Sequence, residues 1–232
     1  MLLYYVRHGD PTYNPDQLTP LGHMQAHSVA KRLASHGIDR IYCSTSTRAM
    51  ETAQPLCDIL KKKMILQDWC NEHYAFMDLS VPIPNNDRLW AIMVPESRKQ
   101  LFSKEVLDLG FQWYDHPDFA DTNFKAGIQR IQRETDAFLE SLGYARDEEL
   151  RCYRQLRENN ERIALFAHDG VGGGILSHIL GFPYPQYALR FSMGVSTVTV
   201  LEFKETQGVV IPSVRCFSND SHLYRDGYPT RY

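Results

Sequence analysis

A chain of 232 residues with 43% hydrophobic and 12% aromatic residues is long enough to bury a core, and we expect one domain over residues 1–232. Its 25 basic and 28 acidic residues leave a net charge of -3 without a long run of either sign, which argues against a nucleic-acid partner and a charged membrane-binding face. The five cysteines are scattered and lack a CxxC pair, so we expect neither a disulfide framework nor a zinc site, and a cytoplasmic location.

The first element is a short apolar run of β-forming residues at positions 2–6, bounded by RHGDP. This pattern predicts a buried strand rather than a signal peptide, and no later stretch is apolar for long enough to span a membrane. A helix follows, because Thr19 suits an N-cap, Pro20 suits the first helical position and Gly37 suits the left-handed residue after the helix end.

Strands and helices then alternate along the chain. The strand-like runs lie at residues 40–44, 64–67 and 162–167, and the helical stretches lie at residues 47–60, 124–142 and 175–180. The glycine-rich run at 168–174 reads as the turn before that last helix, and residues 195–204 and 209–217 read as two closing strands. This order predicts an α/β fold with a mostly parallel central sheet flanked by helices on both faces.

Between residues 74 and 123 the periodicity fades into segments rich in proline, asparagine and aromatic residues. We interpret residues 74–123 as an inserted cap of short helices and loops. In an α/β fold the loops at the carboxyl ends of the strands gather the active site, so we expect the loops after the first strand and after residue 167 to meet.

Several motifs occur in a characteristic order. RHG follows the first strand, LTPLGHMQA opens the first helix, CSTSTRAMETA follows the second strand, NEHY follows the third, and a second histidine, His168, follows a later strand. RHG alone is a weak signal, but the ordered set resembles the histidine phosphatase superfamily, which is phosphoglycerate mutase-like. The resemblance to its mutase and phosphatase branch covers the chain from end to end.

The resemblance implies a role for each residue that matches these motifs. It implies that Arg7, His8, Arg48 and His168 form a phosphate pocket, that Asn14 adds a donor, and that Glu72 is the general acid. These residue types suit the chemistry, because phosphoryl transfer requires positioning and stabilisation of negative charge, which two guanidinium groups supply. His8 can attack phosphorus if its other ring nitrogen keeps the proton, for instance by donating to a backbone carbonyl.

The chain departs from the family pattern at two places. Pro11 stands where a hydroxyl residue is usual, so one donor to phosphate is missing unless Thr12 replaces it. Asp169 directly follows His168, and the acid phosphatase branch of the superfamily uses such a His-Asp pair with the aspartate as proton donor. Asp169 therefore rivals Glu72 as the acid, or contributes to phosphate binding, and we favour Glu72.

Three other function classes are alternatives. A nucleotide-binding module would use the glycines after His168, but these lack the full GxGxxG spacing. A metallohydrolase would use His23 and His27, but the glutamate of an HExxH site is missing, and we expect no metal and no cofactor. A non-catalytic phosphate-binding module is the third alternative, although the intact pocket residues give no reason to prefer it.

Within the superfamily, the expected function is hydrolysis of a small phosphomonoester through a phosphohistidine on His8. The alternative is a phosphoglycerate mutase-type phosphotransferase with the same pocket. The arginine-rich segment that follows NEHY in similar mutases is not found, although Arg88 and Arg98 are available. The expected partner is a small phosphorylated metabolite, and the oligomeric state stays open, with a homodimer as one option.

Overall fold

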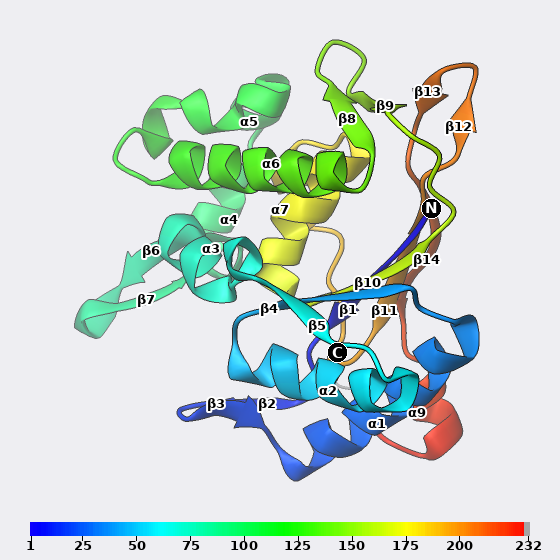
Figure 1. Ribbon diagram of the computed structural model, residues 1–232. Coiled ribbons are helices and arrows are strands. Elements are labelled where there is room, and N and C mark those ends of the chain that lie inside the picture. The colour runs from blue at the N-terminus through cyan, green and yellow to red at the C-terminus, as the bar shows by residue number, and fades with distance from the viewer. Residues whose placement is uncertain (230–232) are drawn as a thin grey trace.

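The core of the fold is a six-stranded sheet, described in a computed structural model over residues 1–229 (Figure 1). The strand order is β14-β11-β1-β10-β4-β5, and β1, β10, β4 and β5 run parallel while β11 is antiparallel to both of its neighbours. The mostly parallel sheet that the sequence predicts is confirmed. The six strands are β1 (Leu2–Arg7), β4 (Arg40–Ser44), β5 (Met64–Gln67), β10 (Arg162–Ala167), β11 (Val198–Glu202) and β14 (Ser213–Asn219).

Helices cover both faces of this sheet, because its central strands are apolar on both sides. Along β1, Leu3 and Tyr5 point into one hydrophobic cluster, and Tyr4 and Val6 point into another. The second cluster lies under α1 (Pro20–His36) and α2 (Thr47–Leu60), and α9 (Ser221–Asp226) packs on α1. The first cluster lies under α3 (Glu72–Leu79), α6 (Phe124–Ser141), α7 (Asp169–Leu180) and α8 (Tyr184–Ala188).

The helix α1 has the ends that its sequence predicts. The Thr19 side chain accepts a hydrogen bond from Gly22 N, Pro20 is the first helical residue, and Gly37 has a left-handed φ of 72°. The predicted helices and strands at 47–60, 64–67 and 124–142 also agree with α2, β5 and α6 to within one residue.

The prediction for the glycine-rich run after His168 is wrong. Residues 170–174 do not form a turn before a helix, because α7 begins at Asp169 and contains all four glycines. The reason is packing: a Cβ atom at Gly170 would lie 2.4 Å from Trp90, and one at Gly172 would lie 2.7 Å from the Tyr5 hydroxyl. The glycines therefore let α7 approach its neighbours closely.

The segment between α3 and α6 consists of short elements beside α6 and α7 (Figure 1). It includes a hairpin that the sequence did not predict. These elements are β6 (Ser80–Ile83), η2 (Pro84–Asn86), β7 (Asp87–Trp90), η3 (Ala91–Met93), α4 (Pro95–Leu101), α5 (Lys104–Asp108), η4 (Gly110–Asp115) and η5 (Pro117–Phe119).

Two further small sheets and one short helix were also not predicted. One is a hairpin directly after the RHG loop, and the other is a four-stranded antiparallel sheet of order β12-β13-β9-β8. These elements are β2 (Pro11–Tyr13), β3 (Asp16–Leu18), η1 (Asp68–Cys70), β8 (Tyr144–Asp147), β9 (Cys152–Gln155), β12 (Glu205–Thr206) and β13 (Val209–Val210).

Candidate active site

The candidate site lies at the carboxyl ends of the parallel strands. His8 directly follows β1 and His168 directly follows β10, and these strands are neighbours in the sheet. The two imidazole rings lie 5.2 Å apart, centroid to centroid. Beside them is a cavity of about 630 Å³ whose lining residues are Arg7, His8, Tyr13, Asp16, Ser46, Arg48, Asn71, Glu72, His73, Phe76, Trp90, Ile92, Met93, Asp169 and Gly170.

His8 is held in one tautomer. Its Nδ1 lies 2.8 Å from the carbonyl oxygen of Gly9, which can only accept, so Nδ1 carries the proton. Burial lowers the pKa of His8 to about 3, the Gly9 contact opposes this, and the positive charges of Arg7 and Arg48 lower the pKa further. The ring is therefore neutral at physiological pH, with a free electron pair on Nε2.

The RHG loop packs tightly on the first turn of α1. A Cβ atom at Gly9 would lie 2.7 Å from Gly22 O, and one at Gly22 would lie 2.2 Å from Asp10 O. Gln25, which is fully buried, accepts a hydrogen bond from Asp10 N with its Oε1 at 2.8 Å. Gly22 and Gln25 of LTPLGHMQA therefore hold the RHG loop against α1.

Arg48 connects three parts of the site. Its Nη1 donates to the carboxylate of Asp16 at 2.6 Å, and its Nη2 donates to His168 Nδ1 at 3.2 Å. Because His168 Nδ1 accepts, its Nε2 carries the proton and donates to Ser44 Oγ at 2.8 Å. Burial, the neighbouring His8 and the two arginines lower the pKa of His168 well below its usual value, so this ring is also neutral.

Arg7 and Asp169 form the other wall. Arg7 Nη1 donates to the Met193 carbonyl and lies 3.6 Å from Asp169 Oδ2, while Asp169 Oδ1 accepts from Met193 N at 2.9 Å. The buried Nε atoms of Arg7 and Arg48 have no hydrogen-bond partner in the described part of the chain. The cavity lining therefore holds two guanidinium groups beside the carboxyl groups of Asp16, Glu72 and Asp169.

Glu72 reaches the site from the start of α3 and binds the start of α7. Its Oε1 accepts from Gly170 N and its Oε2 from Val171 N, both at 2.9 Å. Burial raises the pKa of Glu72, and the two backbone N–H groups oppose this without cancelling it. Burial therefore makes the Glu72 carboxyl group, which lines the same cavity as His8, a weaker acid than an exposed glutamate.

Trp90 of β7 covers this carboxyl group. A Cβ atom built on Gly170 would lie 2.4 Å from the tip of the Trp90 indole and 2.7 Å from Glu72 Oε1. The indole and the carboxyl group are therefore close to the same point of α7. The ring also packs edge-on against Phe76, with centroids 5.4 Å apart. Sequence reasoning missed Trp90, because nothing local marks this residue among the aromatic residues around it.

Other expected residues are not brought to the cavity. Asn14 is exposed at the turn between β2 and β3 and is not among the lining residues. Thr12 does not replace the missing donor, because its hydroxyl donates to Pro15 O at 2.8 Å. Instead the hairpin contributes Tyr13 and Asp16, of which Asp16 holds Arg48. No sequence signal distinguishes Asp16 from other loop acids.

The alternative sites have little support from the geometry. His23 and His27 are exposed on α1, and residues 1–229 contain no group of three His, Cys, Asp or Glu side chains that could hold a metal ion. Over the same residues, no helix combines the length and apolarity needed to cross a bilayer.

Comparisons with known proteins find similar sequences and folds. The sequence model of the histidine phosphatase superfamily (branch 1) matches residues 3–75. The protein named "Putative phosphoserine phosphatase 2" from Hydrogenobacter thermophilus is 24% identical over 149 residues, which are 60% of this chain and 66% of that protein, just under two thirds of its length.

Two solved structures have a similar fold along nearly the whole chain. A mutant phosphoserine phosphatase from Entamoeba histolytica in complex with phosphoserine has a TM-score of 0.63 at 20% identity, covering 96% of this chain and 98% of that one. A mycobacterial glucosyl-3-phosphoglycerate phosphatase in complex with VO3 has a TM-score of 0.60 at 17% identity, covering 94% and 99%. Residues 3–75 are therefore similar to branch 1 of the histidine phosphatase superfamily, and nearly the whole chain has the fold of these two phosphatase structures.

Proposed function

We propose that the protein is a phosphatase that hydrolyses a small phosphomonoester through a phosphohistidine on His8. The observation that carries the proposal is the His8 ring itself. Its Nδ1 proton is held by Gly9 O, and its pKa of about 3 keeps Nε2 unprotonated at physiological pH. Arg7 and Arg48 line the same cavity as His8.

In the first step His8 Nε2 attacks phosphorus and the bond from phosphorus to the ester oxygen breaks. The leaving alkoxide takes a proton from Glu72, whose raised pKa makes the protonated form accessible. In the second step water attacks phosphorus, the bond from phosphorus to nitrogen breaks, and Glu72 takes the proton of the water. Arg7 and Arg48 stabilise the charge on the transferring phosphoryl group, and His168 acts through Arg48, from whose Nη2 it accepts a hydrogen bond.

The lining of the cavity favours hydrolysis over the mutase alternative. The residues that line it from the segment after α3 are apolar, namely Trp90, Ile92 and Met93, and none is an arginine. The guanidinium of Arg88 is engaged by Ser80, at 2.8 Å to its hydroxyl and 2.7 Å to its carbonyl, and Arg98 lines a different hollow. A second charged group of a phosphoglycerate would therefore find no cation in the cap part of this cavity.

The substrate class we propose is a small phosphorylated metabolite. Structures of the Entamoeba histolytica relative contain phosphoserine and 3-phosphoglyceric acid. Phosphoserine, 3-phosphoglycerate and alkyl phosphates of increasing size are thus the first compounds to compare, with release of inorganic phosphate measured against transfer to a second phosphoglycerate. Dominant transfer between phosphoglycerates would favour the mutase.

Rapid mixing with a phosphorus-32 labelled substrate, followed by an alkaline quench, tests the nucleophile. We expect acid-labile label on a peptide containing His8, and no label and no turnover in a folded His8→Ala variant. His23→Ala, which removes an exposed histidine, should behave like the wild type. Label on another residue, or undiminished turnover of His8→Ala, would remove the assignment.

A further inference from the structure

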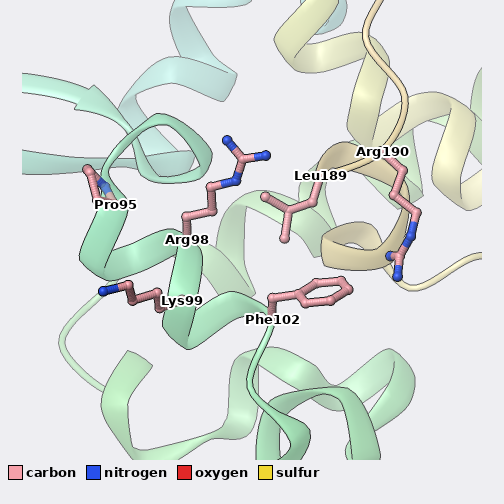
Figure 2. Close-up of a pocket in the computed structure, with 6 residues that line it drawn as sticks. All are labelled: Pro95, Arg98, Lys99, Phe102, Leu189 and Arg190. Atoms are coloured by element: carbon pink, nitrogen blue, oxygen red, sulfur yellow. The ribbon is translucent and has the colours of Figure 1, made fainter.

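A second hollow lies apart from the catalytic cavity, between α4 and the C-terminal end of α8. Its volume is about 590 Å³, within the range of sites for small organic ligands. Figure 2 shows the side chains that surround it, which are Pro95, Arg98, Lys99, Phe102, Leu189 and Arg190. It shares no lining residue with the catalytic cavity.

The lining of the hollow is positively charged, and no carboxylate among its lining residues neutralises this charge. Three of its six lining residues are cations and none is a carboxylate, in a chain whose net charge is -3. The backbones of Arg98 and Lys99 form hydrogen bonds, but their side chains form no hydrogen bond or ion pair with residues 1–229. Arg190 donates to Gln186 O at 3.1 Å, which leaves its charge unneutralised. Cations that lack partners within the chain are available to an anion.

Apolar surface lies next to these charges. The guanidinium of Arg190 is 4.5 Å from the centroid of the Phe102 ring, and Leu189 lies across the hollow from Arg98. Stacking on Phe102 limits the motion of Arg190 and orients its remaining N–H groups. The ligand that suits these walls has two or more negative charges and an apolar part.

Both walls are close in sequence to residues at the catalytic cavity. Pro95 lies two residues after Met93, which lines that cavity. Arg190 lies three residues before Met193, whose N–H donates to Asp169 and whose carbonyl accepts from Arg7. A ligand in the hollow would therefore contact the chain two residues from Met93 of the catalytic cavity and three residues from Met193, which holds Asp169 and Arg7.

We propose that this hollow is a second anion-binding site, for a small organic phosphate or carboxylate with at least two negative charges beside an apolar group. Two sources share this chemistry. One is the distal end of an elongated substrate, which rests on the proposed phosphatase function. The other is a separate effector that binds beside the catalytic cavity.

Calorimetric titration with benzene-1,3,5-tricarboxylate tests the site without relying on activity. At low salt we expect binding that weakens about tenfold in the double variant Arg98→Gln, Arg190→Gln, and that weakens again as salt rises. Arg133→Gln, which removes an exposed arginine of α6, is the matched control and should bind as the wild type does. Undetectable binding to the wild type, or loss in Arg48→Gln with full binding in the double variant, would overturn the proposal.

Kinetics then distinguish the two sources. If the hollow holds the distal end of the substrate, the double variant should raise KM for long ω-carboxyalkyl phosphates about tenfold and leave p-nitrophenyl phosphate unchanged, with the tricarboxylate competing. If it holds an effector, the tricarboxylate should change the kcat for p-nitrophenyl phosphate in the wild type and not in the double variant.

Discussion

Two carboxylates compete for the role of proton donor, and their surroundings differ. Glu72 is bound by two backbone N–H groups at the start of α7 and is covered by Trp90. Asp169 is held by Met193 N and lies near Arg7 and the Ser192 hydroxyl. Burial raises the pKa of Glu72, which is what a donor to an alkoxide requires. The local environment therefore favours Glu72.

The leaving group can identify the donor. A nitrophenolate leaves with little protonation, whereas an alkoxide needs almost a full proton, so removing the true donor should impair alkyl phosphates far more. We expect Glu72→Gln to lower kcat/KM for an alkyl phosphate about 100-fold or more and to affect p-nitrophenyl phosphate less. Asp169→Asn should affect both about equally. Selectivity found only in Asp169→Asn would transfer the role to Asp169.

Trp90 should influence the pH dependence through Glu72. Replacing the indole by a smaller ring admits water to the carboxyl group, which lowers the pKa of Glu72 and decreases its protonated fraction at neutral pH. For Trp90→Phe we expect the alkaline fall of kcat/KM for an alkyl phosphate to move to lower pH.

Trp69→Phe is the matched control for this experiment, because Trp69 packs against Phe138 and does not line the cavity. Its pH profile should match that of the wild type. A uniform loss of activity in Trp90→Phe, with the profile unmoved, would mean that Trp90 only supports the fold.

The sequence indicates those site residues whose position follows from a strand end. His8, Arg48 and His168 lie near the ends of β1, β4 and β10, and parallel strands bring such ends together. Asp16 and Trp90 could not be found this way, since each acts on a residue more than ten positions distant through a contact that only tertiary packing creates.

At the scale of elements, α7 shows how packing overrides local propensity. A run of glycines normally disfavours a helix, by about 1 kcal/mol each relative to alanine. Here Gly170 packs against Trp90 and Gly172 packs against Tyr5, at distances that leave no room for a Cβ atom. These tertiary contacts stabilise the helix in spite of its glycines. The small hairpins escaped prediction for a related reason, since strands of two to four residues are too short for an alternating pattern to be recognised.

A pair of substitutions in α7 separates propensity from packing. A Cβ atom at Gly173 would have its nearest neighbour at 3.6 Å, so Gly173→Ala should stabilise the protein by up to about 1 kcal/mol. At Gly172 the same atom would lie 2.7 Å from the Tyr5 hydroxyl, which itself donates to His168 O at 2.7 Å. Gly172→Ala should therefore destabilise it by about 1–3 kcal/mol.

Urea unfolding of the two variants at one pH measures both effects. Equal changes in the free energy of unfolding would contradict this account, because only the space around each glycine differs between them.

At the scale of the whole molecule, three buried histidines are neutral in the folded state. Besides His8 and His168, His222 donates through Nε2 to Ser196 O at 2.9 Å and accepts from Arg32 at Nδ1, at 3.2 Å. Burial, reinforced by the charge of Arg32, lowers the pKa of His222 to about 4. All three rings take up protons more readily when the chain unfolds.

Stability should consequently fall as pH falls. The unfolded pKa is near 6.5 and the folded pKa of His222 is about 4, so between these values the unfolded chain binds an extra proton. This costs about 1.4 kcal/mol of stability per pH unit for each such histidine. His222→Gln should reduce the difference in free energy of unfolding between pH 7 and pH 5, while exposed His27→Gln should not. An unchanged difference in His222→Gln would contradict the neutral buried form.

The strand order has a consequence for synthesis on the ribosome. β10 lies between β1 and β4, and the other neighbour of β1 is β11, so β1 has no partner in the sheet until residues 162–202 have been made. Until then both edges of β1, whose sequence is LLYYVR, lack a partner strand. Unpaired strand edges can pair with other chains. We therefore expect a chain that ends before residue 162 to aggregate rather than to fold into a partial enzyme.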